Sequence, residues 1–127
     1  MPDWQAEDIP DRDHLFMRVH IRTFARGGIL SAGAFKNHGR GMSTDWDKYS
    51  TAVETRARGP NPPDEYWVVR MNVGEVRGVP GQTVEHSPLP ENRAHTDVIG
   101  EKDEEARVKL RRLSVRVIPP LENTATD

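Results

Sequence analysis

The sequence predicts an α+β fold: a single small domain with a mostly antiparallel, curved sheet of about five strands packed with two helices. Three observations support this prediction. Several short segments alternate apolar and polar residues, as half-buried strands do. Two longer segments carry apolar residues at helical spacing, and Gly and Pro residues separate the segments. The chain has 127 residues, the size of one ordinary domain, so we expect one core.

The first strand is expected at residues 15–22, where apolar and polar residues alternate. Its apolar side consists of Leu15, Met17, Val19 and Ile21, and its other side of Phe16, Arg18, His20 and Arg22. Gly27 and Gly28 then interrupt the strand pattern, and Ser31 is placed to cap a short helical turn. Such a strand would bury one side and leave the basic side chains of the other accessible.

The first of the two helices is expected at residues 45–58, with Asp45 as its N-cap. Gly59 and Pro60 would end this helix, and residues 61–64 would form a stiff connector. Its buried stripe would consist of Trp46, Tyr49, Val53 and Ala57.

Residues 66–73 show the clearest strand pattern in the chain, with Trp67, Val69 and Met71 facing one way. We expect this strand to be central in the sheet. Two shorter strands are expected at residues 82–86 and 93–99. A polar loop that contains two prolines joins them.

The second helix is expected at residues 103–113, because Ala106, Leu110 and Leu113 share one face of a helix there. Acidic residues occupy its first turn and arginines its last, which suits the helix dipole. Residues 114–118 follow as a final strand, which a pair of prolines ends.

The folded domain is expected to span residues 14–118. Residues 1–13 carry five acidic residues without apolar periodicity, so we expect a disordered or loosely docked acidic tail. Residues 119–127 are polar and begin with two prolines, so we expect a flexible C-terminal tail. Neither tail is expected to hold the chemistry.

Composition excludes several classes of site. The chain has no cysteine, which excludes disulfides, thiolate nucleophiles and cysteine-based zinc sites. No run approaches the roughly 18 apolar residues of a membrane span, and the first residues lack the pattern of a secretion signal. We therefore expect a cytoplasmic protein with no membrane partner. The sequence pI of about 6.2 and the lack of a recognition motif argue against sequence-specific nucleic-acid binding.

The charge is distributed unevenly along the chain. The net charge is −2, yet residues 14–44 contain no Asp or Glu, five Arg or Lys residues and three of the five histidines. This basic segment indicates a surface that faces an anion. Arg18, His20 and Arg22 share one side of the first strand and form the most plausible anion clamp. Pairing of these side chains with acidic residues of the tail or of residues 101–105 would explain them equally well.

A second concentration of polar groups lies at residues 84–97, between two expected strands. His86 and His95 are candidates for a general acid or base, and Asp97 is placed to orient His95. Asn92 and Arg93 are candidates for contacts with substrate. A structural pairing of His95 with Asp97 at a sheet edge is an equally good explanation of those two residues.

Other candidates have simpler explanations. A nucleophilic Ser43 or Ser87 beside a histidine is conceivable, but no serine-nucleophile signature supports it. Glu85, Glu91 and Asp97 are an acid–base set in principle, although carboxylates in such loops are more often solvated. Residues 43–45 are explained by helix capping.

These patterns lead to one functional hypothesis and two alternatives. The leading hypothesis is a small ligand-binding domain or enzyme in which Arg18 and His20 of the first strand face the loop at residues 86–97. It would bind or act on a phosphorylated or carboxylated small molecule such as a nucleotide. The first alternative is a non-catalytic interaction module whose basic segment docks a protein partner or a second copy. The second is a structural metal site of histidine and carboxylate ligands. The sequence assigns no cofactor and no particular metal ligand.

Overall fold

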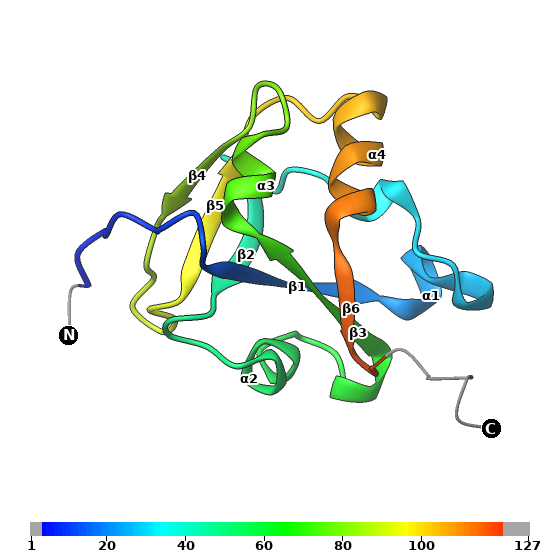
Figure 1. The fold of residues 1–127 in the computed structure, drawn as a ribbon. Coiled ribbons are helices and arrows are strands. Elements are labelled where there is room, and N and C mark those ends of the chain that lie inside the picture. The colour runs from blue at the N-terminus through cyan, green and yellow to red at the C-terminus, as the bar shows by residue number, and fades with distance from the viewer. Residues whose placement is uncertain (1–3, 121–127) are drawn as a thin grey trace.

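Six strands form one open sheet in the computed structural model, which describes residues 4–120 (Figure 1). The strand order is β4-β5-β2-β1-β3-β6, and every neighbouring pair is antiparallel. The strands are β1 (His14–His20), β2 (Met42–Trp46), β3 (Tyr66–Asn72), β4 (Thr83–His86), β5 (His95–Ile99) and β6 (Val115–Ile118). The predicted class is confirmed, because these residues fold as a single small α+β domain on an antiparallel sheet.

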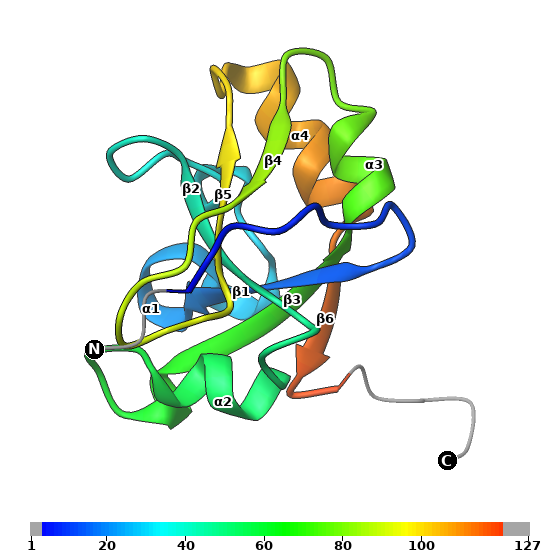
Figure 2. The same cartoon turned by 90° about the vertical axis from the view of Figure 1, so that its left-hand side faces the viewer.

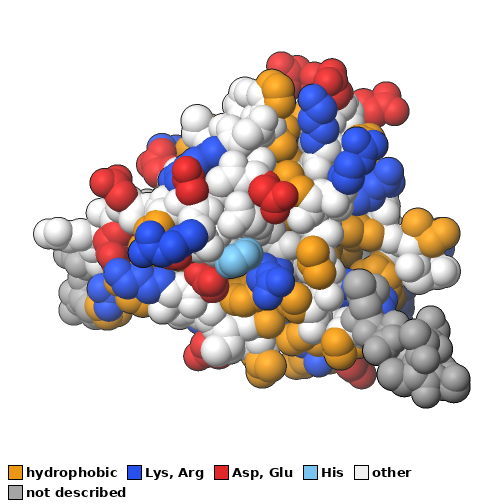
Figure 3. All heavy atoms as spheres, in the orientation of Figure 1, with side chains coloured by type: hydrophobic (Ala, Val, Ile, Leu, Met, Phe, Trp, Pro, Cys, Tyr) orange, Lys and Arg blue, Asp and Glu red, His pale blue; other side chains and the backbone are white. Residues whose placement is uncertain are grey.

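Four α-helices accompany the sheet within the same residues: α1 (Ile21–Phe24), α2 (Ala52–Ala57), α3 (Val73–Arg77) and α4 (Glu104–Leu113). Helix α4 lies where the sequence predicts it, and the Asp103 carboxylate accepts the Ala106 N–H at 2.9 Å as its N-cap. Acidic side chains gather at the N-terminal end of α4 and basic ones further along it (Figure 3). This arrangement complements the helix dipole.

Strand β2 is the main departure from the sequence-based expectation, which places a helix from Asp45 onward. Residues 42–45 pair in antiparallel register with β5, so the segment is a strand in which Met42, Thr44 and Trp46 are buried. The helix begins only after Thr51. The Thr51 hydroxyl accepts the Glu54 N–H at 3.1 Å, and the Glu54 carboxylate accepts the Thr51 N–H at 2.8 Å. Because this reciprocal cap satisfies two free donors, it starts the helix there, and the prediction of a helix over residues 45–51 is wrong.

The two faces of the sheet are covered by different helices. Helices α3 and α4 pack against β3 on one face, and α2 packs against β1, β3 and β6 on the other (Figures 1 and 2). Strand β1 alternates as predicted up to His20: Leu15, Met17 and Val19 are buried in the core, and Arg18 and His20 are partly exposed on the opposite side. The prediction that the strand extends to Arg22 is wrong, because residues 21–24 form α1. The basic side of β1 therefore lies on the face that α2 covers only in part.

Residues 4–13, here called the N-terminal arm, run across the surface and dock on the domain (Figure 2). Ile9 is buried in the core, and the Arg77 guanidinium donates to its carbonyl oxygen at 2.7 Å. These residues belong to the predicted acidic tail, and Ile9 supplies its apolar anchor. Residues 1–3 and most of the predicted C-terminal tail lie outside the described residues.

Strands β1 and β2 separate from each other part of the way along the sheet. They pair only at Leu15 with Trp46 and at Phe16 with Asp45. Beyond this point β1 continues to pair with β3 as far as His20, whereas β2 pairs with β5 as far as Met42. The facing edges of the two strands therefore diverge, and the divergence opens the sheet where the candidate site lies.

No helix among residues 4–120 has the length and apolar character needed to cross a membrane.

Candidate functional site

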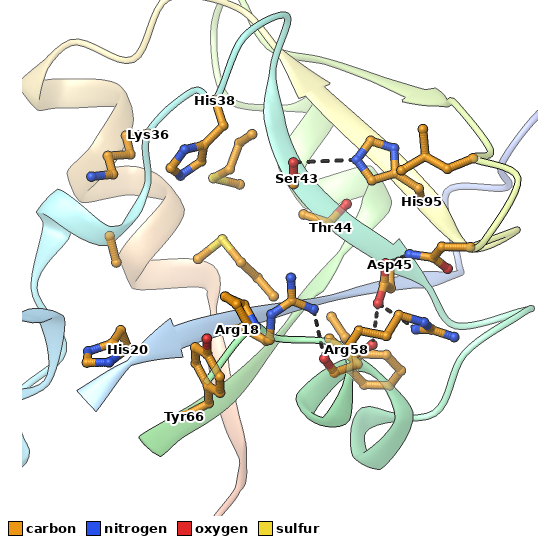
Figure 4. A pocket seen from close by; sticks show the side chains of 18 of the residues that line it. Arg18, His20, Lys36, His38, Ser43, Thr44, Asp45, Arg58, Tyr66 and His95 are labelled. Atoms are coloured by element: carbon orange, nitrogen blue, oxygen red, sulfur yellow. Dashed lines mark hydrogen bonds and ion pairs between the residues drawn. The ribbon is translucent and has the colours of Figure 1, made fainter. Parts of the chain in front are cut away.

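A cavity of about 650 Å³ occupies the divergence between β1 and β2 (Figure 4). Its walls come from both strands, from residues 24–38, from α2 with the residues that follow it, and from the loop before β5. Its polar and charged lining residues are Arg18, His20, Lys36, His38, Ser43, Thr44, Asp45, Thr55, Arg58, Tyr66, Glu91, Asn92 and His95. Segments that are far apart in the sequence thus meet around one hollow.

The lining carries more positive than negative charge that is free to meet a ligand. Asp45 is only 4% exposed, and its carboxylate already accepts from Thr55 Oγ1 at 2.8 Å, Arg58 Nη1 at 2.7 Å and Asn92 Nδ2 at 2.8 Å. These three donors satisfy the carboxylate, and Arg58 neutralises it. Asp45 is therefore a structural hub that ties α2 and the loop before β5 to β2.

Arg18 projects from β1 into the centre of the cavity (Figure 4). Its Nη1 donates to the carbonyl oxygen of Thr55 at 2.8 Å, and its guanidinium carbon lies 6.0 Å from the centre of the Tyr66 ring. Neither contact neutralises the charge. An arginine has five N–H donors, so most of them stay free for an anion.

His20 and Tyr66 lie beyond Arg18 at the same end of the cavity (Figure 4). Their rings meet edge to face with centres 5.7 Å apart, and His20 Nε2 lies 3.4 Å from the Glu65 carboxylate. The Tyr66 hydroxyl accepts the Asn61 N–H at 3.2 Å, which fixes the ring. This end of the cavity therefore combines a held aromatic ring with a histidine.

Lys36 and His38 approach the cavity from the loop before β2 (Figure 4). The Lys36 ammonium lies 5.0 Å from the centre of the Phe24 ring, so its charge rests against an aromatic face and has no carboxylate at that contact. Arg40 of the same loop is different, because both oxygens of Glu85 accept from its Nη2 at 2.7 Å. That ion pair raises the pKa of Arg40 and keeps its charge engaged outside the cavity.

His95 lies at the opposite end of the cavity from His20 and contacts β2 (Figure 4). Its Nδ1 is 2.9 Å from the carbonyl oxygen of Ser87, and its Nε2 is 3.4 Å from Ser43 Oγ. Asp97 lies on the same side of β5, with its Oδ1 4.0 Å from His95 Nε2. The carbonyl oxygen of Ser87, and not the Asp97 carboxylate, therefore holds His95 Nδ1 and orients the ring.

Ser43 reaches this position because β2 lies very close to β5. A Cβ atom on Gly41, two residues earlier, would lie 2.9 Å from the carbonyl oxygen of Val98 and 3.0 Å from Cβ of Asp97. Only glycine fits that approach without a shift of the strands. The register then pairs Ser43 with Asp97 and Asp45 with His95 across the two strands.

Of the eight residues proposed from the sequence for catalysis or ligand contact, four line the cavity together: Arg18, His20, Asn92 and His95. Ser43 and Glu91, for which the sequence offered simpler explanations, line it as well. Asn92 does so with its amide already donating to Asp45, and its Oδ1 accepts the Ala94 N–H at 3.1 Å. Asp97 is not among the lining residues but lies directly behind His95.

The other three lie elsewhere. His86 is only 2% exposed, accepts the Glu7 N–H at its Nδ1 (3.0 Å) and contacts the Arg93 carbonyl oxygen with its Nε2 (2.7 Å). The Arg93 guanidinium stacks over the Tyr49 ring, with its carbon 4.0 Å from the ring centre, outside the cavity lining. Arg22 is exposed on α1 and is not part of the lining. In this fold His86 and Arg93 hold the N-terminal arm.

Several lining residues escape sequence reasoning: Lys36, His38, Arg58 and Tyr66. Lys36 and His38 belong to the basic segment 14–44, but no periodicity predicts where their loop lies, and Arg58 and Tyr66 were expected only as part of a helix and a strand. For His86, the sequence does contain a signal that its side chain is buried. It lies two residues after Val84, so strand alternation directs it toward the same side as an apolar residue.

No group of three or more His, Asp or Glu side chains arranged to hold a metal ion occurs within the described part of the chain, residues 4–120. Comparisons of the sequence and structure with protein-family models, curated proteins and solved structures give no match.

Proposed function

We propose that the protein binds a phosphorylated or carboxylated small molecule in the cavity between β1 and β2. One observation carries the proposal: once Arg58 is paired with Asp45, the lining keeps two cationic side chains, Arg18 and Lys36, and three histidines against one carboxylate, Glu91. An uncompensated positive site in a concave pocket favours an anionic ligand. The absence of acidic residues from the sequence segment 14–44 is consistent with this charge balance.

Arg18 is the central anion contact in this proposal. Its guanidinium is held by Thr55 and offers its remaining N–H groups in a planar fork that suits phosphate or carboxylate. Lys36 would add a second positive charge from the opposite wall. His20 and His38 would donate hydrogen bonds, and each would add charge when protonated.

The aromatic lining favours a ligand that also has a planar ring. Phe16, Phe24 and Tyr66 all line the cavity, and Tyr66 is fixed by its hydrogen bond with Asn61. A held ring provides a stacking surface at low entropic cost. A nucleotide combines such a ring with phosphate, so nucleotides are the first compounds to test, in the cytoplasmic setting that the sequence suggests.

The test is isothermal titration and thermal shift with inorganic phosphate, adenosine monophosphate and succinate, at constant ionic strength. At a ligand concentration of 100 times Kd, binding stabilises a protein by about 2.7 kcal/mol, which gives a clear increase in Tm. We expect at least one of the three to bind. If none binds and none raises the Tm, the proposal is wrong, and a protein-docking role for the basic segment gains support.

Variants locate the site. Lys36→Met should weaken binding about 10-fold, because a charge-assisted contact contributes about 1.5 kcal/mol or more. Arg18→Gln should weaken it further. Arg22→Gln is the matched control, because Arg22 is exposed on the neighbouring α1 and does not line the cavity. Equal weakening by Arg22→Gln and Arg18→Gln would show that the anion binds elsewhere.

A further inference from the structure

Ser43 and His95 lie next to each other at the end of the cavity away from His20, as a nucleophile and a general base do in an active site (Figure 4). Their side chains come from neighbouring strands, and Ser43 Oγ lies 3.4 Å from His95 Nε2. Such contacts are often longer in a ligand-free protein than during reaction. The arrangement goes beyond binding, since it can supply a reaction.

The hydrogen bonds around His95 determine which of its nitrogens carries the proton. Ser87 Oγ lies 3.1 Å from His95 Nδ1, but it donates its proton to Asp97 Oδ2 at 2.8 Å, so toward the imidazole it can only accept. His95 Nδ1 lies 2.9 Å from the Ser87 carbonyl oxygen, which also only accepts. Nδ1 therefore carries the proton, and Nε2 directs its lone pair at Ser43.

Burial fixes the imidazole in this orientation. The His95 side chain is 16% exposed and the Asp97 side chain 10%. Asp97 lies 4.0 Å from Nε2, where its negative charge stabilises the imidazolium that forms when Nε2 takes a proton. Ser87 is thus the positioning residue for His95, and Asp97 acts only through its charge.

We propose that Ser43 and His95 form a catalytic pair that hydrolyses a carboxylic ester carrying a negatively charged group. The identity of the charged group rests on the proposed function, because Arg18 and Lys36 would hold it. The reacting carbonyl would be neutral before attack.

The reaction needs only water as a second reactant. Ser43 Oγ forms a bond with the carbonyl carbon while its proton passes to His95 Nε2. The bond between that carbon and the ester oxygen then breaks, and the leaving alcohol takes the proton from Nε2. Water attacks the acyl-serine, passes a proton to Nε2, and releases the acid as that proton returns to Ser43 Oγ.

Two matched esters and a serine-directed probe test the proposal. The esters are p-nitrophenyl hydrogen glutarate, which is anionic, and p-nitrophenyl valerate, which has an acyl chain of the same length without the charge. The probe is a fluorophosphonate, whose attachment site is read by peptide mass spectrometry. We expect labelling at Ser43 and a higher kcat/KM for the glutarate ester.

Variants separate the pair from background hydrolysis. Ser43→Ala should abolish labelling at this site, and both Ser43→Ala and His95→Gln should lower kcat/KM by about 100-fold or more, as expected for loss of a nucleophile or base. Ser114→Ala, at the end of α4, is the control and should behave like the wild type. An unlabelled Ser43 in the wild type, or hydrolysis that persists in Ser43→Ala, would overturn the proposal.

Two further measurements complete the test. The first tests the role of His95 even if His95→Gln does not fold, and the second separates this proposal from the proposed function. In the wild-type protein the labelling rate at Ser43 should rise with pH, because only the neutral imidazole can accept the proton of Ser43. A labelling rate that is independent of pH would count against His95. Binding of phosphate to Ser43→Ala tests the proposed function separately. If the variant binds phosphate and the wild type does not hydrolyse the esters, only the proposed catalytic pair is wrong. If the wild type hydrolyses the esters but binds no anion, only the proposed anion site is wrong.

Discussion

At the scale of single residues, Asp45 organises the candidate site. Its carboxylate receives hydrogen bonds from α2, from the residue that follows α2, and from the loop before β5. Each donor comes from a different part of the cavity wall. A buried carboxylate with three donors is stable as an anion only while its partners stay in place. Asp45 therefore couples the shape of the cavity to the stability of the domain.

Asp45→Asn should lower the free energy of unfolding by about 2 kcal/mol, because it leaves Arg58 without its counter-charge in a partly buried position. Urea denaturation measures this change. Asp47→Asn is a matched control, since Asp47 pairs with His14 at 3.6 Å and is one-third exposed, so we expect a much smaller loss. A loss as large for Asp47 as for Asp45 would contradict the role assigned to Asp45.

At the scale of elements, β2 shows what sequence patterns could and could not predict. The alternation that identifies β1 extends over seven residues, and α4 has a cap and charged ends, so both were predictable. Strand β2 has only five residues, and Asp45 within it resembles a helix cap. Its strand conformation depends on pairing with β5, which is about fifty residues away, and no local pattern encodes that contact.

The N-terminal arm is a second element whose structure depends on contacts that its own sequence does not predict. Its acidic composition predicts a tail, yet Glu7 contacts three residues of the domain. The Glu7 carboxylate accepts from Lys48 Nζ at 2.8 Å and from the Tyr49 hydroxyl, and these bonds lower its pKa. Its N–H donates to His86. The arm is thus docked through a histidine that, from the sequence alone, resembles a catalytic residue.

His86→Ala should release the arm, because it removes the acceptor of the Glu7 N–H and leaves a hole beside Trp46. We expect a loss of about 3 kcal/mol in the free energy of unfolding. Hydrogen exchange at residues 4–13 should become faster. His86→Gln, which keeps an acceptor, should lose less. Unchanged exchange in the arm of His86→Ala would show that His86 does not hold it.

At the scale of the whole molecule, the candidate site depends on how the sheet brings distant segments together. The sequence suggested that Arg18 and His20 face the loop before β5, and they do line one cavity with Asn92 and His95. No local pattern could establish this meeting, because it depends on the strand order and on the divergence of β1 from β2. The divergence results from competition between two complete pairings, β1 with β3 and β2 with β5. Lys36 and Arg58 enter the site only through that geometry.

A buried cation makes the stability of the whole domain depend on pH. Lys102 donates to the carbonyl oxygens of Val98 and Gly100, and burial lowers its pKa to about 8. The unfolded chain keeps the lysine protonated to about pH 10.5. Between these values the unfolded state binds more protons, so the free energy of unfolding rises with pH.

Lys102→Met removes this dependence. Urea denaturation of both proteins between pH 8 and pH 10.5 should show the wild type gaining about 1 to 3 kcal/mol relative to the variant, at about 1.4 kcal/mol per pKa unit. A constant difference between the two proteins over this range would mean that the pKa of Lys102 is the same in the folded and unfolded states.

The central claim is that an anion binds between β1 and β2. Chemical-shift mapping by nuclear magnetic resonance, during titration with adenosine monophosphate, tests it most directly. The account predicts that the shifts concentrate at Arg18, Lys36, Ser43 and His95 and saturate together. Shifts that concentrate instead at Arg111 and Arg112 on α4, or that spread evenly over the basic surface, would contradict it.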